Sequence, residues 1–458
     1  MTEAIINTIS SNQSLEDQSH TKKTRAIKIT CRIIGVLDDG IKSISAQSLY
    51  YIKQADVIIG GTRTLELFKS YYSSASSQLD LTGNITKIPF WIKTAQQNNQ
   101  HVVVLATGDP LCHGIAKYIK EKIDFATCEI HPNVSTIQHA CARIGLAWQD
   151  LKICSAHNKD TGEWQTGSDS QHSLYFLLQQ LHQHDKLAVF TSPENSPDRI
   201  ARMLKTEGFE SDFTLTVVEN ILRPDENIIE AIDINTATKK SFANLNIVIL
   251  QRINKKTNSV ILGCADHLYK QRKPNKGLIT KREVRVVSLA RMQLHQNSIV
   301  WDIGAGSGSV GLEASRLCPN GHVYAIEKNT EDFNIASQNK KAMRATNYTL
   351  VNAKAPALLE LWPDPDAIFI GGSGGELAEL ISICISRMLS NACLVMNFVT
   401  IENMATAVES LKSFNITWDV TQLSAARSKP ILHMNRLQAE NPVWIVTAQK
   451  QVDENEQN

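Results

Sequence analysis

Short apolar runs alternate with longer stretches of helical character along the whole chain, and this alternation limits the fold more than any other feature. A chain in which helices separate successive strands forms an α/β fold, where the helices cover a sheet. In the second half, helical stretches of suitable length separate the first five runs, and the last two lie close to the C-terminus. Such runs occupy residues 298–303, 322–326, 348–351, 367–370, 392–398, 416–420 and 443–447. The pattern predicts a Rossmann-like, doubly wound sheet of seven strands that ends in an antiparallel hairpin.

The first half has the same alternation with different spacing, and no internal repeat joins the two halves. Its strand candidates are residues 27–37, 55–59, 101–105, 128–131, 151–155, 186–191, 213–218 and 245–250. We therefore predict two different α/β domains, which fits the two to three domains expected for 458 residues. The predicted limits are a disordered polar tail at 1–25, a first domain of two α/β lobes at 26–252, a basic linker at 253–275, a second domain at 276–450 and a polar tail at 451–458.

The predicted linker is rich in lysine and arginine. Because runs of like charge usually face water, we interpret it as a solvated connection and not as an anion-binding surface. The basic residues concerned are Arg252, Lys255, Lys256, Lys270, Arg272, Lys273 and Lys276.

The composition excludes several classes of protein. Lys and Arg number 47 and Asp and Glu number 46, so the chain lacks the basic surplus of a nucleic-acid-binding protein. No apolar run approaches the ~20 residues that span a bilayer, so we expect no membrane partner. The nine cysteines are scattered without a C-x-x-C pair, which predicts neither a disulfide framework nor a metal site and favours a reducing cytoplasm. We also expect a homo-oligomer.

A glycine-rich turn follows the strand candidate at 298–303 and precedes a helix. Glycines let a ligand approach the backbone, and the free N–H groups of a helix N-terminus favour negative charge. Glu327 ends the next strand candidate, where a carboxylate can accept hydrogen bonds from both hydroxyls of a ribose. The turn spans Asp302 to Gly311 and reads DIGAGSGSVG.

Two ligands fit this turn equally well. Residues 306–311 match the dinucleotide fingerprint G-x-G-x-x-G, which favours NAD. Residues 304–308 fit S-adenosylmethionine (SAM), whose carboxylate the loop would hold while Asp302 faced its ammonium. A third match, G-x-S-x-G at 371–375 with Asp419 and His433 in triad order, satisfies the pattern of a hydrolase elbow. Because a cofactor loop already occupies the first strand, we set the hydrolase interpretation aside.

Several strings of the second half, over about 276 to 450, together resemble the decarboxylating precorrin methyltransferase domain of cobalamin biosynthesis. They are GLITKREVR at 277–285, DIGAGSGSVG at 302–311, AIE at 325–327, NAKAP at 352–356, PDAIFIGGSGG at 365–375 and NFVTIE at 397–402. The resemblance implies a SAM-dependent class I methyltransferase. It implies cofactor contacts at Asp302, Gly304, Gly306, Gly308, Glu327, Ala353, Gly371 and Gly372.

The first half, over about 27 to 250, resembles the tetrapyrrole methylase family. The matching strings are GVLDDG at 35–40, LATGDPL at 105–111, VSTIQ at 134–138 and TSPENSP at 191–197, with Glu219 and PDE at 224–226. The resemblance implies a second SAM site at Gly108, Asp109, Pro110, Ser135 and Thr136. Leu37, Cys112 and His113 depart from the family pattern, which leaves open a first half that binds tetrapyrrole without catalysis.

The two resemblances together imply a bifunctional enzyme. It would methylate a precorrin at carbons 5 and 15 and remove carbon dioxide from the ring C acetate to form precorrin-8, with the conjugated ring as electron sink. Since a precorrin carries many carboxylates, basic side chains should line the mouth of the pocket. The candidate catalytic residues are Lys281, Glu283, Arg285, Asn397 and Glu402, with Arg282, Arg427 and Lys429 as further basic candidates. An NAD-dependent oxidoreductase remains the alternative from another class.

Overall fold

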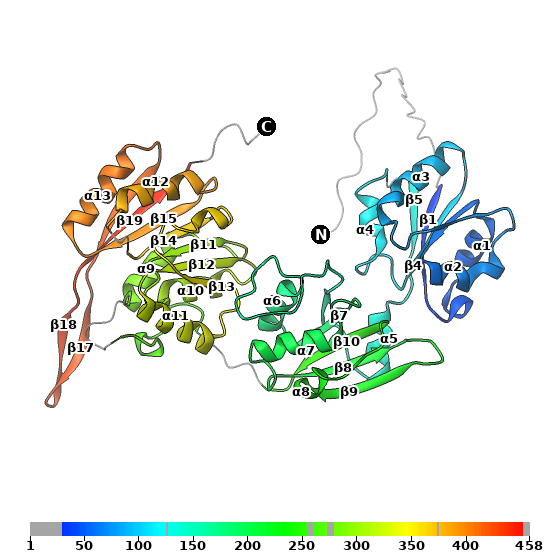
Figure 1. The fold of residues 1–458 in the computed structure, drawn as a ribbon, viewed down its shortest axis with the longest axis horizontal. Coiled ribbons are helices and arrows are strands. Elements are labelled where there is room, and N and C mark those ends of the chain that lie inside the picture. Colours follow the sequence, from blue (N-terminus) through cyan, green and yellow to red (C-terminus); the bar gives the residue numbers. More distant parts are fainter. Residues whose placement is uncertain (1–29, 125–126, 255–259, 273–278, 373–374, 452–458) are drawn as a thin grey trace, which may run out of the picture. The chain divides into compact units, whose positions relative to one another are not determined.

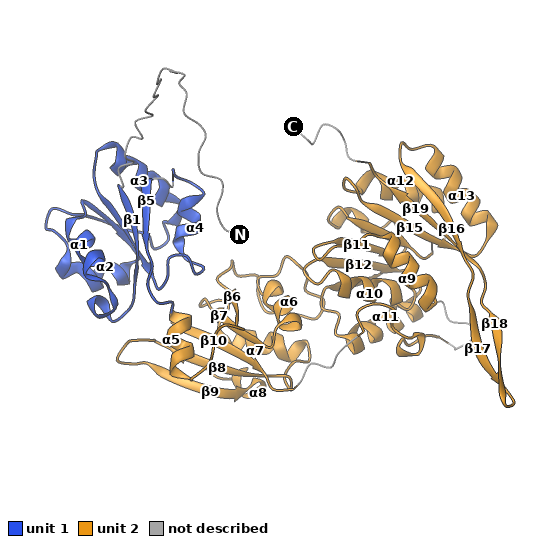
Figure 2. Cartoon of the chain, turned by 180° about the vertical axis from the view of Figure 1, so that it is seen from behind, with its two compact units in different colours: residues 1–135 blue, residues 136–458 orange. Residues whose placement is uncertain are grey.

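The computed structural model describes residues 30–124, 127–254, 260–272, 279–372 and 375–451. The predicted tail at 1–25, and all but the first residue of the tail at 451–458, lie outside these ranges. The chain divides into two compact units, residues 1–135 and residues 136–458 (Figure 2). This division falls inside the first predicted domain and not at its end.

Unit 1 is a parallel five-stranded sheet of order β3-β2-β4-β1-β5. The central strands are apolar on both faces: residues 102–106 of β4 are all buried, as a strand covered on both sides requires. The strands are β1 Cys31–Val36, β2 Val57–Gly60, β3 Ser77–Asp80, β4 Val102–Thr107 and β5 Cys128–His131 (Figure 1). The helices are α1 Ala46–Gln54, α2 Thr62–Phe68, α3 Ile88–Gln97 and α4 Ile115–Lys120.

Unit 2 begins with a mixed sheet of order β6-β7-β10-β8-β9, in which only β6 and β7 pair in parallel. Its strands are β6 Lys152–Ser155, β7 Lys186–Phe190, β8 Phe213–Glu219, β9 Asn227–Asp233 and β10 Asn246–Arg252. Its helices are α5 Thr136–Arg143, α6 Tyr175–Gln183, α7 Pro197–Thr206 and α8 Ile234–Ala237. This sheet and that of unit 1 account for the two predicted lobes of the first half.

The second sheet of unit 2 has seven strands in the order β13-β12-β11-β14-β15-β19-β16. Strand β19 runs antiparallel to both of its neighbours, β15 and β16. The strands are β11 Ile299–Ile303, β12 His322–Glu327, β13 Tyr348–Asn352, β14 Ala367–Ile370, β15 Cys393–Phe398, β16 Thr417–Leu423 and β19 Val443–Gln449. The helices are α9 Arg282–Arg291, α10 Ser309–Leu317, α11 Thr330–Met343, α12 Leu377–Arg387 and α13 Ile401–Lys412. The predicted seven-stranded sheet is confirmed.

Two details of that prediction are wrong. Only a short 3-10 turn at Leu359–Leu361 lies between β13 and β14, where we expected a helix of full length. The last two strands are not joined by a hairpin turn, because a two-stranded ribbon is inserted between β16 and β19. The ribbon consists of β17 Ala426–Ile431 and β18 Met434–Ala439, and most of its residues are exposed.

The structure describes residues 253–254 and 260–272 of the predicted linker, and residues 260–272 pack against the seven-stranded body. Cys264 and Tyr269 are each 2% exposed and belong to the core that contains Leu312 and Tyr348. Cys264 and Tyr269 are therefore not part of a solvated connection, whereas the basic Lys270 between them and α9 is exposed. Apolar anchors and long-range hydrogen bonds hold them.

The two sheets of unit 2 meet at a contact that we call the joint, defined by Tyr175, His182 and Asp212 on one side and His322 and Arg344 on the other. The Tyr175 hydroxyl donates to the Gly321 carbonyl (3.1 Å) and lies 2.7 Å from Nδ1 of His322. Arg344 pairs with Asp212. Burial lowers the pKa of His322 to about 3, so its imidazole is neutral at the joint.

None of the helices in the described part of the chain combines the length and the apolar character that crossing a membrane requires.

Candidate functional site

A cavity of about 940 Å³ opens at the carboxyl ends of the parallel strands in the seven-stranded sheet. In open α/β sheets this edge is where ligands bind, because the strands end there in loops and helix N-termini. The cavity has a cofactor side, formed by the loops after β11, β12, β13 and β14. It has an opposite side formed by the start of α9, the end of β15 and the base of the ribbon. The lining residues include Arg272, Thr280, Lys281, Glu283, Gly304, Gly306, Glu327, Lys328, Asp332, Ala353, Lys354, Gly371, Gly372, Asn397, Val399, Gln438, Glu440 and Asn441.

Two glycine loops approach each other closely on the cofactor side. Gly304 has φ +72°, and a Cβ built on it would lie 2.6 Å from the carbonyl oxygen of Gly372. A side chain is therefore excluded at 304 both by conformation and by space. Gly308, with φ +77°, is the N-cap of α10 and does not line the cavity. The predicted cradle is thus formed by Gly304 and Gly306 together with Gly371 and Gly372.

Glu327 is held in place by backbone donors at the end of β12. Its Oε2 accepts from the Gly306 amide and its Oε1 from the Asn329 amide, both at 2.8 Å. The side chain is almost buried, yet the residue lines the cavity. A fixed carboxylate beside a glycine loop suits a ligand with vicinal hydroxyls.

Asp302 lies under the glycine loop with one oxygen unsatisfied. Its Oδ2 accepts from the Gly311 amide (3.1 Å), whereas the buried Oδ1 has no hydrogen-bond partner in the described structure. Burial raises the pKa of Asp302 to about 7. The neighbouring hydroxyl of Tyr348 is also buried without a partner. The structure therefore contains acceptor and donor capacity beneath the loop that no protein group uses.

The segment before α9 completes the cofactor side. Arg272 forms a bidentate ion pair with Asp332, with Nε–Oδ1 and Nη2–Oδ2 distances of 2.7 and 2.5 Å. Asn339 donates to the carbonyl of Ser307 (2.8 Å) and accepts from the amide of Lys270 (2.8 Å), so it links this segment to the glycine loop. Sequence reasoning missed these residues, because each lies 32 to 69 residues from its partner in the chain.

Three of the five candidate catalytic residues line the cavity, namely Lys281, Glu283 and Asn397. Lys281 is the N-cap of α9. The Asn397 amide exchanges hydrogen bonds with the Ser288 hydroxyl (2.9 and 3.1 Å). Glu283 pairs with Arg427 on the ribbon, and this hydrogen bond is the main cause of its lowered pKa.

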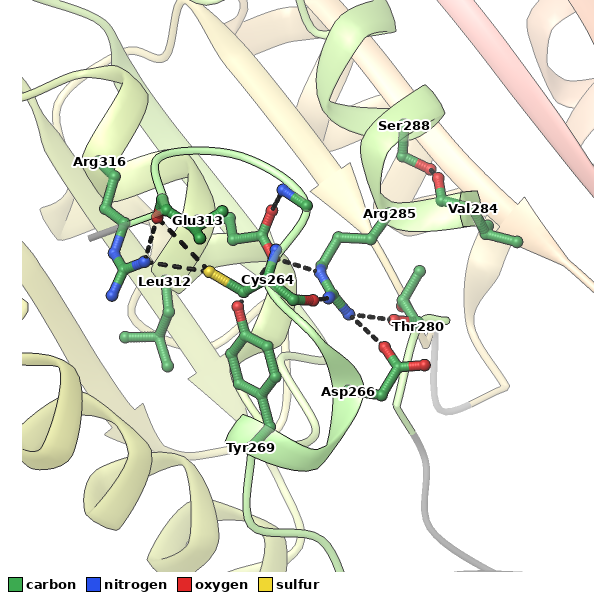
Figure 3. Close-up of polar contacts among 12 residues, drawn as sticks. Cys264, Asp266, Tyr269, Thr280, Val284, Arg285, Ser288, Leu312, Glu313 and Arg316 are labelled. Atoms are coloured by element: carbon green, nitrogen blue, oxygen red, sulfur yellow. Dashed lines mark hydrogen bonds and ion pairs between the residues drawn. The ribbon is translucent and has the colours of Figure 1, made fainter. Parts of the chain in front are cut away.

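Arg285 and Glu402 do not line the cavity, and the buried Arg285 has no exposed surface through which to contact a substrate. The Arg285 side chain is fully buried, and its Nε donates to Glu313 at 2.7 Å (Figure 3). Its other nitrogens donate to Asp266, to the Thr280 carbonyl and to the Cys264 carbonyl. Glu402 lies exposed in the first turn of α13, turned to solvent. Arg285 instead stabilises the wall next to Thr280.

Four of the five residues predicted for the first site lie in unit 1. Gly108 has φ +70°, and its carbonyl oxygen would lie 2.4 Å from a Cβ on Gly35, so both glycines are needed for this close approach. Asp109 accepts from the amide of Leu111 (2.9 Å), and the Pro110 carbonyl accepts from Ala116 (3.2 Å). Ser135, also in unit 1, donates to the thiol of Cys112 (3.7 Å), whereas Thr136 begins α5 in unit 2.

Nothing among the described residues supports the hydrolase triad. Asp419 on β16 pairs with Arg291 (3.0 Å), and His433 lies in the turn of the ribbon. Ser373 lies outside the described residues. The glycines at 371 and 372 line the cavity beside Gly304, which agrees with a role in the cofactor loop.

Two family models match the chain. Residues 30–232 match the tetrapyrrole (corrin/porphyrin) methylases, and residues 273–450 match the precorrin methyltransferase domain. Together these matches cover both predicted domains.

Among curated proteins, the chain is 28% identical over 416 residues to a precorrin-6Y C(5,15)-methyltransferase (decarboxylating) of a Sinorhizobium species, covering 90% of this chain and 94% of that one. It is 32% identical over 174 residues to the cobalt-precorrin-6B C(15)-methyltransferase (decarboxylating) of Salmonella typhimurium, which covers 38% of this chain and 90% of that one. A crystal structure of a precorrin-6Y C5,15-methyltransferase from Geobacter metallireducens is similar at 40% identity and a TM-score of 0.40, and covers 42% of this chain and all of that one.

The sequence matches agree with the resemblances seen in the glycine loop, in Glu327 and in the Gly-Asp-Pro turn. The chain therefore belongs to the decarboxylating precorrin methyltransferases, with a tetrapyrrole methylase domain and a precorrin methyltransferase domain in one polypeptide.

Proposed function

We propose that this chain methylates a precorrin at carbons 5 and 15 and removes carbon dioxide from the ring C acetate, forming precorrin-8. The observation that carries the proposal is the cavity at the strand ends. It has a preformed glycine cradle and a fixed carboxylate on one side, and on the other a lysine that has no ion-pair partner among the described residues. The matched family models support one catalytic domain at 26–252 and another at 276–450. The cytoplasm and a homo-oligomeric assembly remain our predictions.

We propose SAM as the cofactor on the side of the cavity formed by β11 to β14. Gly304, Gly306, Gly371 and Gly372 would hold its methionine part, and Glu327 its ribose. Asp302, whose buried Oδ1 has no partner, would satisfy the ammonium group. When bound, SAM supplies the methyl group.

The substrate would occupy the side formed by α9, the end of β15 and the base of the ribbon. Among the described residues, Lys281 lines this side without an ion-pair partner, so it is available for a substrate carboxylate. Val399 is 64% exposed at the same edge and offers an apolar surface to the ring. Asn397, fixed by Ser288, is placed to orient a polar group of the ring.

Methyl transfer to carbon needs the two reacting atoms in line and in contact. Holding them so can contribute ~7–11 kcal/mol, and this suits a cavity without an obvious nucleophile. The electron pair released when carbon dioxide leaves would enter the conjugated ring. The protein's part is to orient the substrate through Lys281 and Asn397 and to keep the cofactor rigid through Glu327.

For the first half we propose methylation at carbon 5, with Gly108, Asp109, Pro110, Ser135 and Thr136 as cofactor contacts. Leu37, the departure that motivates a non-catalytic first half, is 2% exposed and so packs inside unit 1. That burial supports an active first domain.

The test is incubation of the whole chain with precorrin-6B and labelled SAM. We expect two methyl additions and one loss of carbon dioxide. One addition would contradict the proposal for one of the two domains, and none would contradict the proposed function. Binding of SAM without binding of NAD, measured by calorimetry, would exclude the oxidoreductase alternative.

A further inference from the structure

Arg427, at the start of the ribbon, forms ion pairs with two carboxylates from different parts of the chain. Its Nη1 donates to Oδ2 of Asp266 at 2.8 Å, and its Nη2 donates to Oε2 of Glu283. Glu283 lines the cavity on the substrate side, next to Lys281 in sequence. The ribbon thus places a positive charge on an acid that faces the substrate.

We propose that Arg427 is a specificity-determining residue: by neutralising Glu283, it allows the substrate side of the cavity to accept a polycarboxylate. This inference rests on the proposed function, because a substrate with several carboxylates is the ligand that an unpaired Glu283 would repel. Like charges brought together in a partly buried site disfavour binding of a ligand, and opposite charges help to orient it.

The pair with Arg427 is part of a longer row of alternating charges. Glu313 accepts from Arg285 (2.7 Å), Arg285 donates to Asp266 (3.2 Å), and Asp266 accepts from Arg427 (Figure 3 shows the first three of these residues). Glu313 is fully buried and also accepts from the amides of Gly263 and Cys264 and from the Tyr269 hydroxyl. The buried end of the row therefore fixes Asp266, and Asp266 fixes Arg427 against Glu283.

This arrangement argues against a direct contact of Arg427 with substrate. Both terminal nitrogens of its guanidinium already donate to protein carboxylates, and its Nε is buried. Lys281 has no ion-pair partner among the described residues. The exposed Arg282 lies 3.9 Å from Glu283 and adds only a weak second charge. In this proposal Lys281 binds a carboxylate of the substrate, and Arg427 neutralises the negative charge of Glu283.

The test compares the whole chain with the variants Arg427→Gln, Glu283→Gln and the double variant. For Arg427→Gln we expect the KM for precorrin-6B to rise about tenfold or more, with kcat and the Kd for SAM within about twofold of the parent. In the double variant the acid is gone as well, so the KM should return to within about threefold of the parent value. Arg436→Gln is the matched control, because Arg436 is exposed on the same ribbon, away from the cavity lining.

A purely structural role for Arg427 would leave the KM of the double variant as high as that of Arg427→Gln, and this result would overturn the inference. An unchanged KM in Arg427→Gln would overturn it as well. If Arg427→Gln does not fold, Glu283→Gln alone tests the inference. We then expect its KM for precorrin-6B at low salt to be lower than that of the parent, and a higher KM would contradict the inference. A parent chain that transfers no methyl group would contradict the proposed function instead.

Discussion

Two buried acids of the cofactor side differ in what surrounds them. Glu327 accepts from two backbone amides, each 2.8 Å away, whereas Asp302 accepts from one and leaves Oδ1 unsatisfied. Burial without full hydrogen bonding destabilises the charged form of a carboxyl group, and this explains the raised pKa of Asp302, about 7. We therefore expect replacement of Asp302 to change the pH dependence of stability, and replacement of Glu327 to change cofactor binding.

Replacing Asp302 by Asn should change how stability depends on pH. The pKa is 3.8 for the unperturbed group and about 7 in the folded protein, so between these values the folded chain keeps a proton that the unfolded chain has lost. The free energy of unfolding therefore falls as pH rises from about 4 to about 7, by at most ~4 kcal/mol. We expect the Tm of Asp302→Asn minus the Tm of the parent to be larger at pH 8 than at pH 5. Parallel pH profiles for the two proteins would contradict this, and Asp225→Asn serves as an exposed control.

Replacing Glu327 by Gln should weaken SAM binding. The change removes the negative charge of a carboxylate that we assign to the ribose hydroxyls. A hydrogen bond to a charged group contributes about 1.5–3 kcal/mol, so the Kd should rise roughly ten- to hundredfold. Isothermal titration calorimetry measures this, with Glu409→Gln on α13 as the control at an exposed acid. An unchanged Kd would show that the ribose does not contact Glu327.

At the scale of elements, the cofactor side depends on the contact between the loops after β11 and β14. Gly304→Ala would place a methyl group 2.6 Å from the Gly372 carbonyl at a backbone angle of φ +72°. The left-handed conformation alone costs ~1–2 kcal/mol with a side chain, and the steric overlap adds to it. We expect a lower Tm and loss of SAM binding. Gly372→Ala, whose Cβ meets no atom within 4 Å, should keep the parent Tm, and equal Tm values for both variants would contradict the argument.

Most strands that the sequence predicts have buried apolar runs. Six strands of the seven-stranded sheet carry at least three consecutive apolar or small residues. β16 is the exception, because its sequence TWDVTQL contains no such run and none of its residues is buried. The strands that were missed contain no buried residue, and they are β3, β9, β17 and β18. Edge strands and ribbons are stabilised by pairing and not by burial, so hydrophobic pattern does not reveal them.

The same reason separates the predicted from the unpredicted part of the site. Gly304, Gly306 and Glu327 lie in local motifs, and the structure brings them together as expected. Arg285 was assigned to substrate because a polycarboxylate ligand calls for basic side chains at the mouth of the pocket. Its burial depends on Glu313, 28 residues further along the chain, and no local pattern shows that pairing.

At the scale of the whole molecule, unit 2 contains two sheets with separate hydrophobic cores, and hydrogen bonds, an ion pair and a ring contact connect them at the joint. His322 begins β12, whose other end carries Glu327, so the joint and the cofactor side lie at opposite ends of one strand. A neutral, buried imidazole between Tyr175 and Thr349 is costly to leave without partners.

Tyr175→Phe should therefore weaken the joint without disturbing the shape of the core. The change removes the hydroxyl that forms hydrogen bonds with the Gly321 carbonyl and with His322, and it should lower the free energy of unfolding by ~1–3 kcal/mol. We expect faster amide hydrogen exchange in α6 and at the start of β12, measured by mass spectrometry. Tyr50→Phe is the control, since Tyr50 is 57% exposed. Unchanged exchange at both elements would mean that the hydroxyl contributes nothing to the joint.

The position of the ribbon has one more consequence. Leu423 at the end of β16 and Val443 at the start of β19 are partners in register, so the chain leaves the sheet and returns to it at a single point. We therefore expect that a change in the length or sequence of the residues between them would leave the strands of the sheet in place. The molecule thus offers an insertion point where a different wall of the cavity could be installed, by evolution or by an engineer, over an unaltered glycine cradle.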